Sequence, residues 1–255
     1  MKTKYILALS GNDIFSSGGL HADLTTYAVH KLHGFVAVTC LTAMTEKGFE
    51  VIPTETVVFA QQLASLKDVP FSAIKIGLLP TVDIAEQALA FVKAHQEIPV
   101  VLDPVLVCKE THDTEVSQLR DELLKFLPYV SIITPNLAEA QLLLQKEKDI
   151  ETVEEMKQAA VALYDLGAKA VVIKGGNRLD GSEAIDVFYD GQEVVVLQSP
   201  LLSENNVGAG CTFASSIASQ LLLGREPFEA VRLSKDFVHA AIEKSDDYGV
   251  IQYEK

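Results

Sequence analysis

The chain has 255 residues, with 21 Lys and Arg against 35 Asp and Glu, so its formal net charge at pH 7 is −14. Hydrophobic residues make up 48% and charged residues 22%, which is typical of a folded globular protein and excludes a disordered chain. The acidic balance argues against nucleic acid or an anionic membrane as a partner, and three cysteines without CxxC spacing favour a reducing, cytoplasmic location over a disulfide framework or zinc cage.

Strand-like and helix-like segments alternate along nearly the whole chain. In the first half, strands are expected at residues 6–9, 35–41, 73–76 and 99–102, and helices at 21–32, 56–66, 84–94 and 117–126. In the second half, strands are expected at 130–133 and 170–173, and helices at 137–144 and 153–166. Two more strands, 184–189 and 193–197, flank the turn signal Asp190-Gly191 and predict a hairpin, which helices at 212–223 and 228–244 follow.

This alternation predicts an α/β fold whose mostly parallel sheet is covered by helices on both faces and carries a late antiparallel hairpin. No linker or internal repeat divides the chain, so residues 1–255 are interpreted as a single domain. Ligands of such sheets bind beyond the carboxyl ends of the strands. The residues at those positions are Gly11-Asn12-Asp13, Met44, Gly77, Asp103-Pro104, Pro135-Asn136 and Lys174-Gly175-Gly176.

The strongest local signal is a glycine-rich turn that opens an apolar helix. It reads Asn205-Asn206-Val207-Gly208-Ala209-Gly210-Cys211-Thr212. Backbone amides that converge at a helix N-terminus bind anions, and a thiol at that place is expected to have a pKa below that of a free cysteine. The alternative is a tight turn followed by a small buried cysteine.

Two carboxylates and a lysine form a second group of candidates. Asp103 and Glu139 each follow an apolar strand and could hold Mg²⁺, directly or through water, against nucleotide phosphates. The alternative is that Asp103 ends its strand and Glu139 occupies the first turn of a helix. Lys174 could reach a phosphate as a point charge, or it could be a solvated lysine at a strand end. The loop at residues 10–19 lacks both the P-loop and the GxGxxG spacing.

Taken in order, several segments resemble the ribokinase superfamily of small-molecule kinases. They are most similar to its branch of hydroxymethylpyrimidine kinases and bacterial pyridoxal/pyridoxine kinases. The segments are Ala8-Leu9-Ser10-Gly11-Asn12-Asp13, Ala22-Asp23-Leu24, Ile74-Lys75-Ile76-Gly77-Leu78-Leu79, Asp103-Pro104-Val105-Leu106-Val107-Cys108-Lys109, Thr134-Pro135-Asn136-Leu137-Ala138-Glu139-Ala140 and Gly208-Ala209-Gly210-Cys211-Thr212-Phe213. The resemblance implies a three-layer α/β/α ribokinase-like fold and ATP-dependent phosphorylation of a small substrate.

The resemblance also implies roles for individual residues. Cys211 would take the proton from the substrate hydroxyl, in an anion hole made by the amides of Gly208, Ala209 and Gly210. Asp103 and Glu139 would organise Mg²⁺. The nucleotide would meet Asn136, Glu139, Lys174, Asp186 and Gly210. The vitamin pocket would be lined by Asp13, Met44 and Gly77, and Cys108 could add reversibly to the pyridoxal aldehyde.

Within this branch, two features favour the vitamin B6 enzymes. Hydroxymethylpyrimidine kinases typically carry a Gln at the position of Met44, and the triplet Val107-Cys108-Lys109 looks like the pyridoxal kinase version. The sequence therefore favours a pyridoxal/pyridoxine/pyridoxamine kinase that uses ATP and Mg²⁺ and, by resemblance, forms a homodimer. The alternatives are a hydroxymethylpyrimidine/phosphomethylpyrimidine kinase and a non-catalytic B6-binding protein. The loop at residues 14–19, His21, Val207 and the pair Phe49-Glu50 depart from the family pattern.

Overall fold

The nine strands of the described chain form one sheet in a computed structural model that describes residues 3–106 and 113–253. The strand order is β3-β2-β1-β4-β5-β6-β7-β8-β9. The strands are β1 (Tyr5–Asn12), β2 (His33–Thr45), β3 (Gly48–Pro53), β4 (Phe71–Ile76), β5 (Val100–Leu102), β6 (Ile132–Ile133), β7 (Val171–Gly176), β8 (Glu183–Tyr189) and β9 (Val194–Pro200). The six central strands, β2, β1, β4, β5, β6 and β7, pair in parallel with their neighbours. At the two edges, β3 pairs antiparallel with β2, and β8 pairs antiparallel with both β7 and β9.

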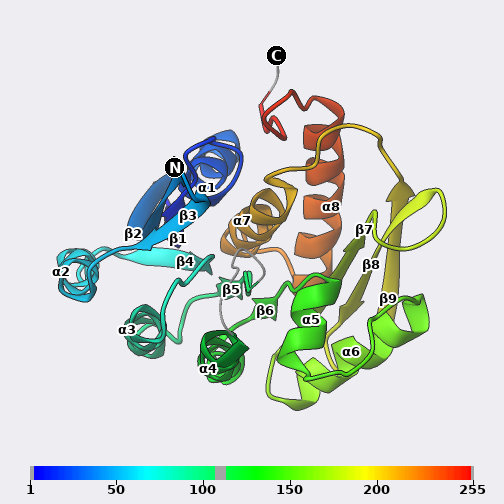
Figure 1. Cartoon of the computed structure of the whole chain (residues 1–255), viewed down its shortest axis with the longest axis horizontal. Helices are drawn as coiled ribbons and strands as arrows, with labels where there is room; N and C mark the ends of the chain where they lie inside the picture. Colours follow the sequence, from blue (N-terminus) through cyan, green and yellow to red (C-terminus); the bar gives the residue numbers. More distant parts are fainter. Residues whose placement is uncertain (1–2, 107–112, 254–255) are drawn as a thin grey trace.

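Helices cover both faces of the sheet, which gives three layers (Figure 1). One face carries α1 (Gly19–Val29), α7 (Ala209–Leu222) and α8 (Pro227–Glu243). The other carries α2 (Thr56–Leu66), α3 (Val82–Lys93), α4 (Asp113–Leu124), α5 (Leu137–Leu143) and α6 (Val153–Asp165), with the short 3₁₀ helix η1 (Leu127–Tyr129) before β6. The predicted α/β/α ribokinase-like fold with its late antiparallel hairpin is confirmed.

The alternation of side chains along β1 explains why both faces need cover. Leu7 and Leu9 belong to the core beneath α2 to α6, whereas Ile6 and Ala8 belong to the core beneath α1, α7 and α8. All four side chains are completely buried. A strand buried on both sides reads as a continuous apolar run, and this is how it could be recognised in the sequence.

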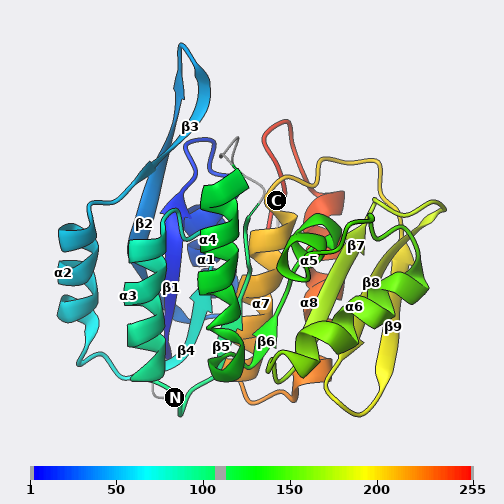
Figure 2. The same ribbon diagram turned by 60° about the horizontal axis from the view of Figure 1, so that its bottom comes forward.

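The hairpin formed by β2 and β3 was not predicted. Its tip projects beyond the rest of the sheet (Figure 2), and Leu41, Met44, Phe49 and Ile52 are exposed along it. Because these apolar side chains face solvent, the segment lacks the apolar alternation that identifies a half-buried strand. Gly48 adopts a φ of 105° at the turn, which favours glycine over any other residue.

No helix within residues 3–106 and 113–253 is both long and apolar enough to cross a lipid bilayer. Residues 207–224 carry no charge and lie largely in α7, where nine of the fourteen residues are buried.

Candidate active site

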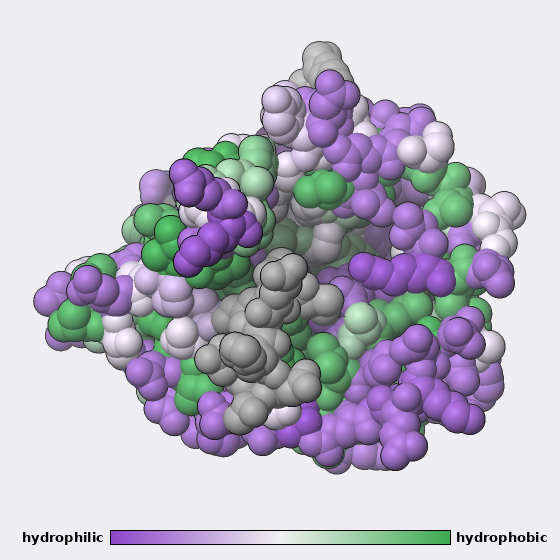
Figure 3. Space-filling model, viewed as in Figure 1, coloured by the Kyte–Doolittle hydropathy of each residue, from purple (hydrophilic) through white to green (hydrophobic). Residues whose placement is uncertain are grey.

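A cavity of about 440 Å³ opens at the carboxyl edge of the sheet, where the parallel strands end. The face seen in Figure 3 is hollowed near its centre, on the side from which these loops emerge. Ten of the residues to which the resemblance gives a role line this cavity: Asp13, Asp103, Asn136, Glu139, Lys174, Asp186, Gly208, Ala209, Gly210 and Cys211. Segments that are far apart in the sequence therefore meet beyond the carboxyl ends of the strands, where ligands of such sheets bind.

The glycine turn before α7 forms a helix N-terminus that opens into the cavity. Gly208 caps the helix in the left-handed conformation, with a φ of 85°. A Cβ atom on Gly208 would lie 1.8 Å from the carbonyl oxygen of Ser17, so no other residue fits. The first amides of a helix have no acceptor within the helix, and the Lys174 ammonium would lie 3.4 Å from a Cβ atom on Gly210. The Ala209 amide donates to the Asn206 carbonyl oxygen at 3.1 Å, so the other amides of the first turn and a cation converge on a site suited to an anion.

Cys211 lies in the first turn of α7, beside the loop that follows β1. A Cβ atom on Gly18 would lie 3.7 Å from its sulfur, and the Gly19 amide donates to it. Burial nevertheless raises the pKa of the Cys211 thiol to about 11, although Lys75 and the Gly19 amide lower it. The expectation of a lowered pKa is therefore wrong, because the loss of hydration outweighs the helix N-terminus.

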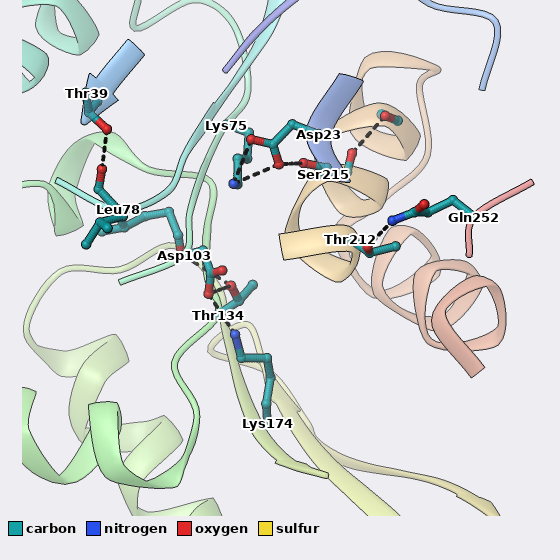
Figure 4. A network of polar contacts seen from close by, with 12 residues as sticks. Asp23, Thr39, Lys75, Leu78, Asp103, Thr134, Lys174, Thr212, Ser215 and Gln252 are labelled. Atoms are coloured by element: carbon teal, nitrogen blue, oxygen red, sulfur yellow. Dashed lines mark hydrogen bonds and ion pairs between the residues drawn. The ribbon is translucent and has the colours of Figure 1, made fainter. Parts of the chain in front are cut away.

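Asp103 and Lys174 form a buried ion pair on the floor of the cavity. Asp103 follows β5 and is 2% exposed, and the Lys174 Nζ lies 2.7 Å from its Oδ1 atom. The Thr134 hydroxyl donates to the same oxygen at 3.2 Å (Figure 4). Burial alone would lower the pKa of Lys174, but Asp103 and Glu139 raise it above its usual value. Lys174 is thus a buried cation and not the solvated strand-end residue considered as the alternative.

Asn136 and Glu139 form a capping box at the start of α5. The Asn136 Oδ1 accepts from the Glu139 amide at 3.0 Å, and the Glu139 Oε2 accepts from the Asn136 amide at 2.8 Å. Burial raises the pKa of Glu139 to about 7, with Asp103 adding to the effect and Lys174 opposing it. The structural interpretation of Glu139 as a first-turn residue is therefore correct, and it does not exclude a role in ligand binding.

The two carboxylates fit a Mg²⁺ ion that shares its ligands with a nucleotide. Lys174 and Thr134 bind Asp103 through Oδ1, and Glu139 uses Oε2 for the cap, while the other oxygen of each makes no hydrogen bond within the described residues. No cluster of three or more His, Cys, Asp or Glu side chains suited to a metal exists in this part of the chain. Protein Mg²⁺ sites commonly offer only one or two carboxylates, with phosphate and water completing the shell.

Asp186 lies in the cavity wall with both carboxylate oxygens engaged. Its Oδ1 accepts from the Gly175 amide at 3.1 Å, and its Oδ2 pairs with Lys235 on α8 at 2.7 Å. Lys235 also donates to the Ala184 carbonyl oxygen at 3.0 Å. The sequence analysis missed Lys235, since its partner lies 49 residues away on a different element. It also missed Arg178 and His239, which line the same cavity.

The residues expected to bind the vitamin are not all brought together. Asp13 organises its own loop, because its Oδ2 accepts from the Gly18 amide at 2.8 Å and its Oδ1 from the Phe15 amide at 3.0 Å. Gly77 follows β4, outside the residues that line the cavity. Cys108 lies outside the described residues.

Met44 lies near the tip of the β2–β3 hairpin, is 59% exposed and does not line the cavity. Alternate residues of a strand share a face, so Met44 is on the same side as Thr42. The Thr42 hydroxyl accepts from the Ile14 amide at 2.9 Å. Met44 therefore belongs to the side of the hairpin that meets the loop after Asp13.

A buried ion pair between Asp23 and Lys75 was also missed, although both residues lie within segments quoted for the family resemblance. It lies on the α1 and α7 side of the sheet, and Ser215 completes it (Figure 4).

An anion site at the start of a helix, with a cysteine and a cation beside it, suits the transfer of a phosphoryl group to a small molecule. A sequence model of the phosphomethylpyrimidine kinase family matches residues 13–254, and the chain belongs to this family.

Three relatives illustrate how far the similarity extends. The chain is 38% identical to a pyridoxine kinase of Bacillus subtilis over 94% of its own length and 90% of the relative. It is 34% identical to a hydroxymethylpyrimidine/phosphomethylpyrimidine kinase of Aquifex aeolicus, over 95% of this chain and 96% of the relative. The structure of Staphylococcus aureus pyridoxal kinase in complex with AMP-PCP and pyridoxal superposes with a TM-score of 0.90 at 33% identity, covering 99% and 94% of the two chains. The chain is thus an ATP-dependent kinase.

Proposed function

We propose that this kinase transfers the γ-phosphoryl group of ATP to the 5′-hydroxymethyl group of pyridoxal, pyridoxine or pyridoxamine, in the salvage of vitamin B6. The observation that carries the proposal is the convergence of Cys211, Lys174 and the N-terminus of α7 on one cavity. Met44 lies outside the cavity and supports the choice of vitamin through the family resemblance alone, because a thioether cannot both donate to and accept from an aminopyrimidine as a Gln amide does.

In this mechanism, the protein mainly positions the reactants and stabilises charge, since phosphoryl transfer needs little covalent help. The amides at Gly208, Ala209 and Gly210 hold the phosphoryl oxygens, and Lys174 adds a positive charge. Asp103 and Glu139 would hold Mg²⁺, which neutralises charge on the nucleotide phosphates when bound. Asn136 fixes the start of α5, and with it the Glu139 side chain.

Cys211 accepts the proton of the substrate hydroxyl as the oxygen attacks phosphorus. Only the thiolate can do so, and a pKa of about 11 leaves the ligand-free thiol almost entirely protonated at neutral pH. A thiolate with so high a pKa is a strong base, but the thiol must first lose its own proton to solvent, and the enzyme must stabilise the anion that remains until it accepts the substrate proton. Cationic groups near the sulfur are therefore important for turnover.

Three further proposals concern the protein as a whole. Residues 1–255 form a single domain, two copies form a homodimer, and the enzyme works in the cytoplasm. The exposed apolar side chains Leu41 and Ile52 on the β2–β3 hairpin supply a surface that a second copy could cover, and a catalytic thiol needs a reducing compartment. Sedimentation of the purified chain tests the dimer, and a monomer at assay concentrations contradicts it.

The deciding experiment is an ADP-release assay with Mg-ATP that compares pyridoxal, pyridoxine, pyridoxamine and hydroxymethylpyrimidine at equal concentration. A preference for the B6 vitamers is expected. A preference for the pyrimidine would replace the proposal with hydroxymethylpyrimidine/phosphomethylpyrimidine kinase activity, which the name of the matching family favours. No turnover with any substrate, together with B6 binding in calorimetry, would indicate a non-catalytic B6-binding protein.

The variant Cys211→Ala tests the proposed proton transfer. It removes the proton acceptor and leaves the cavity otherwise unchanged, so kcat is expected to fall by about 10²–10⁴ while vitamin binding remains. Equal turnover of the variant and the wild type would show that Cys211 is not the base.

A further inference from the structure

Lys75 carries a buried charge that the mechanism above does not use. It lies in β4, its side chain is completely buried, and its Nζ lies 2.8 and 3.1 Å from the two carboxylate oxygens of Asp23 on α1, which is equally buried. Burying such an ion pair in place of apolar side chains is often neutral or unfavourable for stability. Packing alone therefore does not explain why the chain retains it.

The ion pair contacts α7 at Ser215, one helical turn after Cys211. The Ser215 hydroxyl donates to the Asp23 Oδ1 at 2.5 Å. Ser215 follows Cys211 by four residues on α7, and residues with this spacing lie above one another on one face of a helix. The face of α7 that presents Cys211 to the site thus also presents Ser215 to Asp23. Figure 4 shows Ser215, Asp23 and Lys75 in contact.

The Lys75 ammonium also lies close to the carboxyl edge of the sheet. A Cβ atom on Gly77 would lie 2.8 Å from the Lys75 Nζ and 3.3 Å from the Ser10 hydroxyl oxygen. Gly77 follows the end of β4 and Ser10 lies near the end of β1. The buried Ser10 hydroxyl has no hydrogen-bond partner within residues 3–106 and 113–253. The cation is therefore buried beneath the carboxyl ends of β1 and β4.

Charged and titratable groups from several elements face Cys211. Lys75 on β4 is the cation with the greatest effect on its pKa, which it lowers, whereas Asp103 after β5 and Asp23 on α1 raise it. Tyr27 on α1 and Lys174 on β7 also interact with the Cys211 charge. Burial lowers the pKa of Lys75, but Asp23 and the other anions raise it, so Lys75 is protonated.

We propose that Lys75 is a positioning residue for phosphoryl transfer: its charge, held in place by Asp23, stabilises the thiolate of Cys211. The inference rests on the proposed role of Cys211 as the base. The proton moves from the substrate hydroxyl to the Cys211 sulfur, while Lys75 keeps all its protons throughout.

The test compares three variants of the full-length enzyme. Lys75→Met alone leaves Asp23 buried and unpaired, which can prevent folding, so the main variant is the double substitution Lys75→Met with Asp23→Asn. It removes both charges and leaves no buried ion without a partner. Ser215→Ala is the matched control, because it removes one hydrogen bond to Asp23 but keeps both charges.

The first readout is the pH dependence of Cys211 alkylation by iodoacetamide, followed at the Cys211 peptide by mass spectrometry. Because Lys75 acts on Cys211 more strongly than Asp23 does, the double variant is expected to shift the alkylation profile toward higher pH, so that Cys211 is alkylated more slowly at a given pH. Its kcat at neutral pH is expected to fall by about tenfold or more with the KM for ATP unchanged. Ser215→Ala is expected to change the rate of Cys211 alkylation and the kcat by less than about threefold each.

A folded double variant with the wild-type alkylation profile overturns the proposal, because Lys75 then acts on structure alone. Failure of the proposed function gives a different result. If Cys211→Ala retains turnover, Cys211 is not the base, whereas a shifted alkylation profile in the double variant still shows that Lys75 stabilises the thiolate.

Discussion

Glu139 should make the ligand-free protein less stable as the pH rises. It is 4% exposed, and burial raises its pKa from the usual 4.5 to about 7. The native state thus binds a proton that the unfolded chain has already lost, so the stability falls between pH 4.5 and pH 7. A difference of 2.5 units at about 1.4 kcal/mol per unit corresponds to a loss of about 3 kcal/mol above pH 7.

Glu139→Gln removes this penalty without removing the helix cap, because a Gln side chain can accept the same hydrogen bond from the Asn136 amide. We expect the variant and the wild type to differ by less than about 1 kcal/mol near pH 5, and the variant to be more stable by about 3 kcal/mol near pH 8. Urea unfolding in the presence of EDTA, without nucleotide, measures this difference. The same variant should lose most of its Mg-ATP-dependent turnover.

Glu155→Gln is the matched control, since Glu155 occupies the same capping-box position in α6 with Thr152. Hydrogen bonds from the Glu151 amide and the Thr152 hydroxyl lower the pKa of Glu155, so its substitution should lower stability, and more so at higher pH. A stability difference for Glu139→Gln that stays constant from about pH 5 to about pH 8 would refute the reasoning about its buried charge.

Three other substitutions test the remaining parts of the site. Gly208→Ala places a Cβ atom 1.8 Å from the Ser17 carbonyl oxygen, and a kcat lower by about 10²–10³ is expected in steady-state assays, as for the loss of an oxyanion donor. Met44→Gln should raise kcat/KM for hydroxymethylpyrimidine relative to pyridoxal by about tenfold, which corresponds to one hydrogen bond, in a competition assay. Lys174→Met leaves Asp103 buried without its cation, so urea unfolding should show a loss of about 3–5 kcal/mol, and the KM for ATP should rise.

The regular alternation of strands and helices explains why much of the site could be predicted. Parallel strands end at one edge of the sheet, so Asp103 and Lys174 come together although 71 residues separate them. The β2–β3 hairpin could not be found in the same way. Its exposed apolar residues, such as Met44 and Phe49, carry no period of two relative to a core.

The error at Cys211 has a different cause. The glycine turn identifies a helix N-terminus from sequence alone, and this local effect lowers the pKa of a thiol. How deeply the sulfur is enclosed depends on packing between α7 and the loop after β1, which are about 200 residues apart in a chain of 255. Burial is the larger effect, and it decides the sign.

A signal for the missed ion pair was nevertheless present. Lys75 stands in an otherwise apolar strand between Ile74 and Ile76, and Asp23 stands between Ala22 and Leu24 in a helix. A charged residue almost never becomes fully buried unless it has a partner, so a charge at a core position implies an opposite charge at another. Because few core positions carry a charge, each of these two residues predicts the other as its partner. The same reasoning makes Lys75 informative about Cys211, since a cation buried beneath a thiol favours its thiolate.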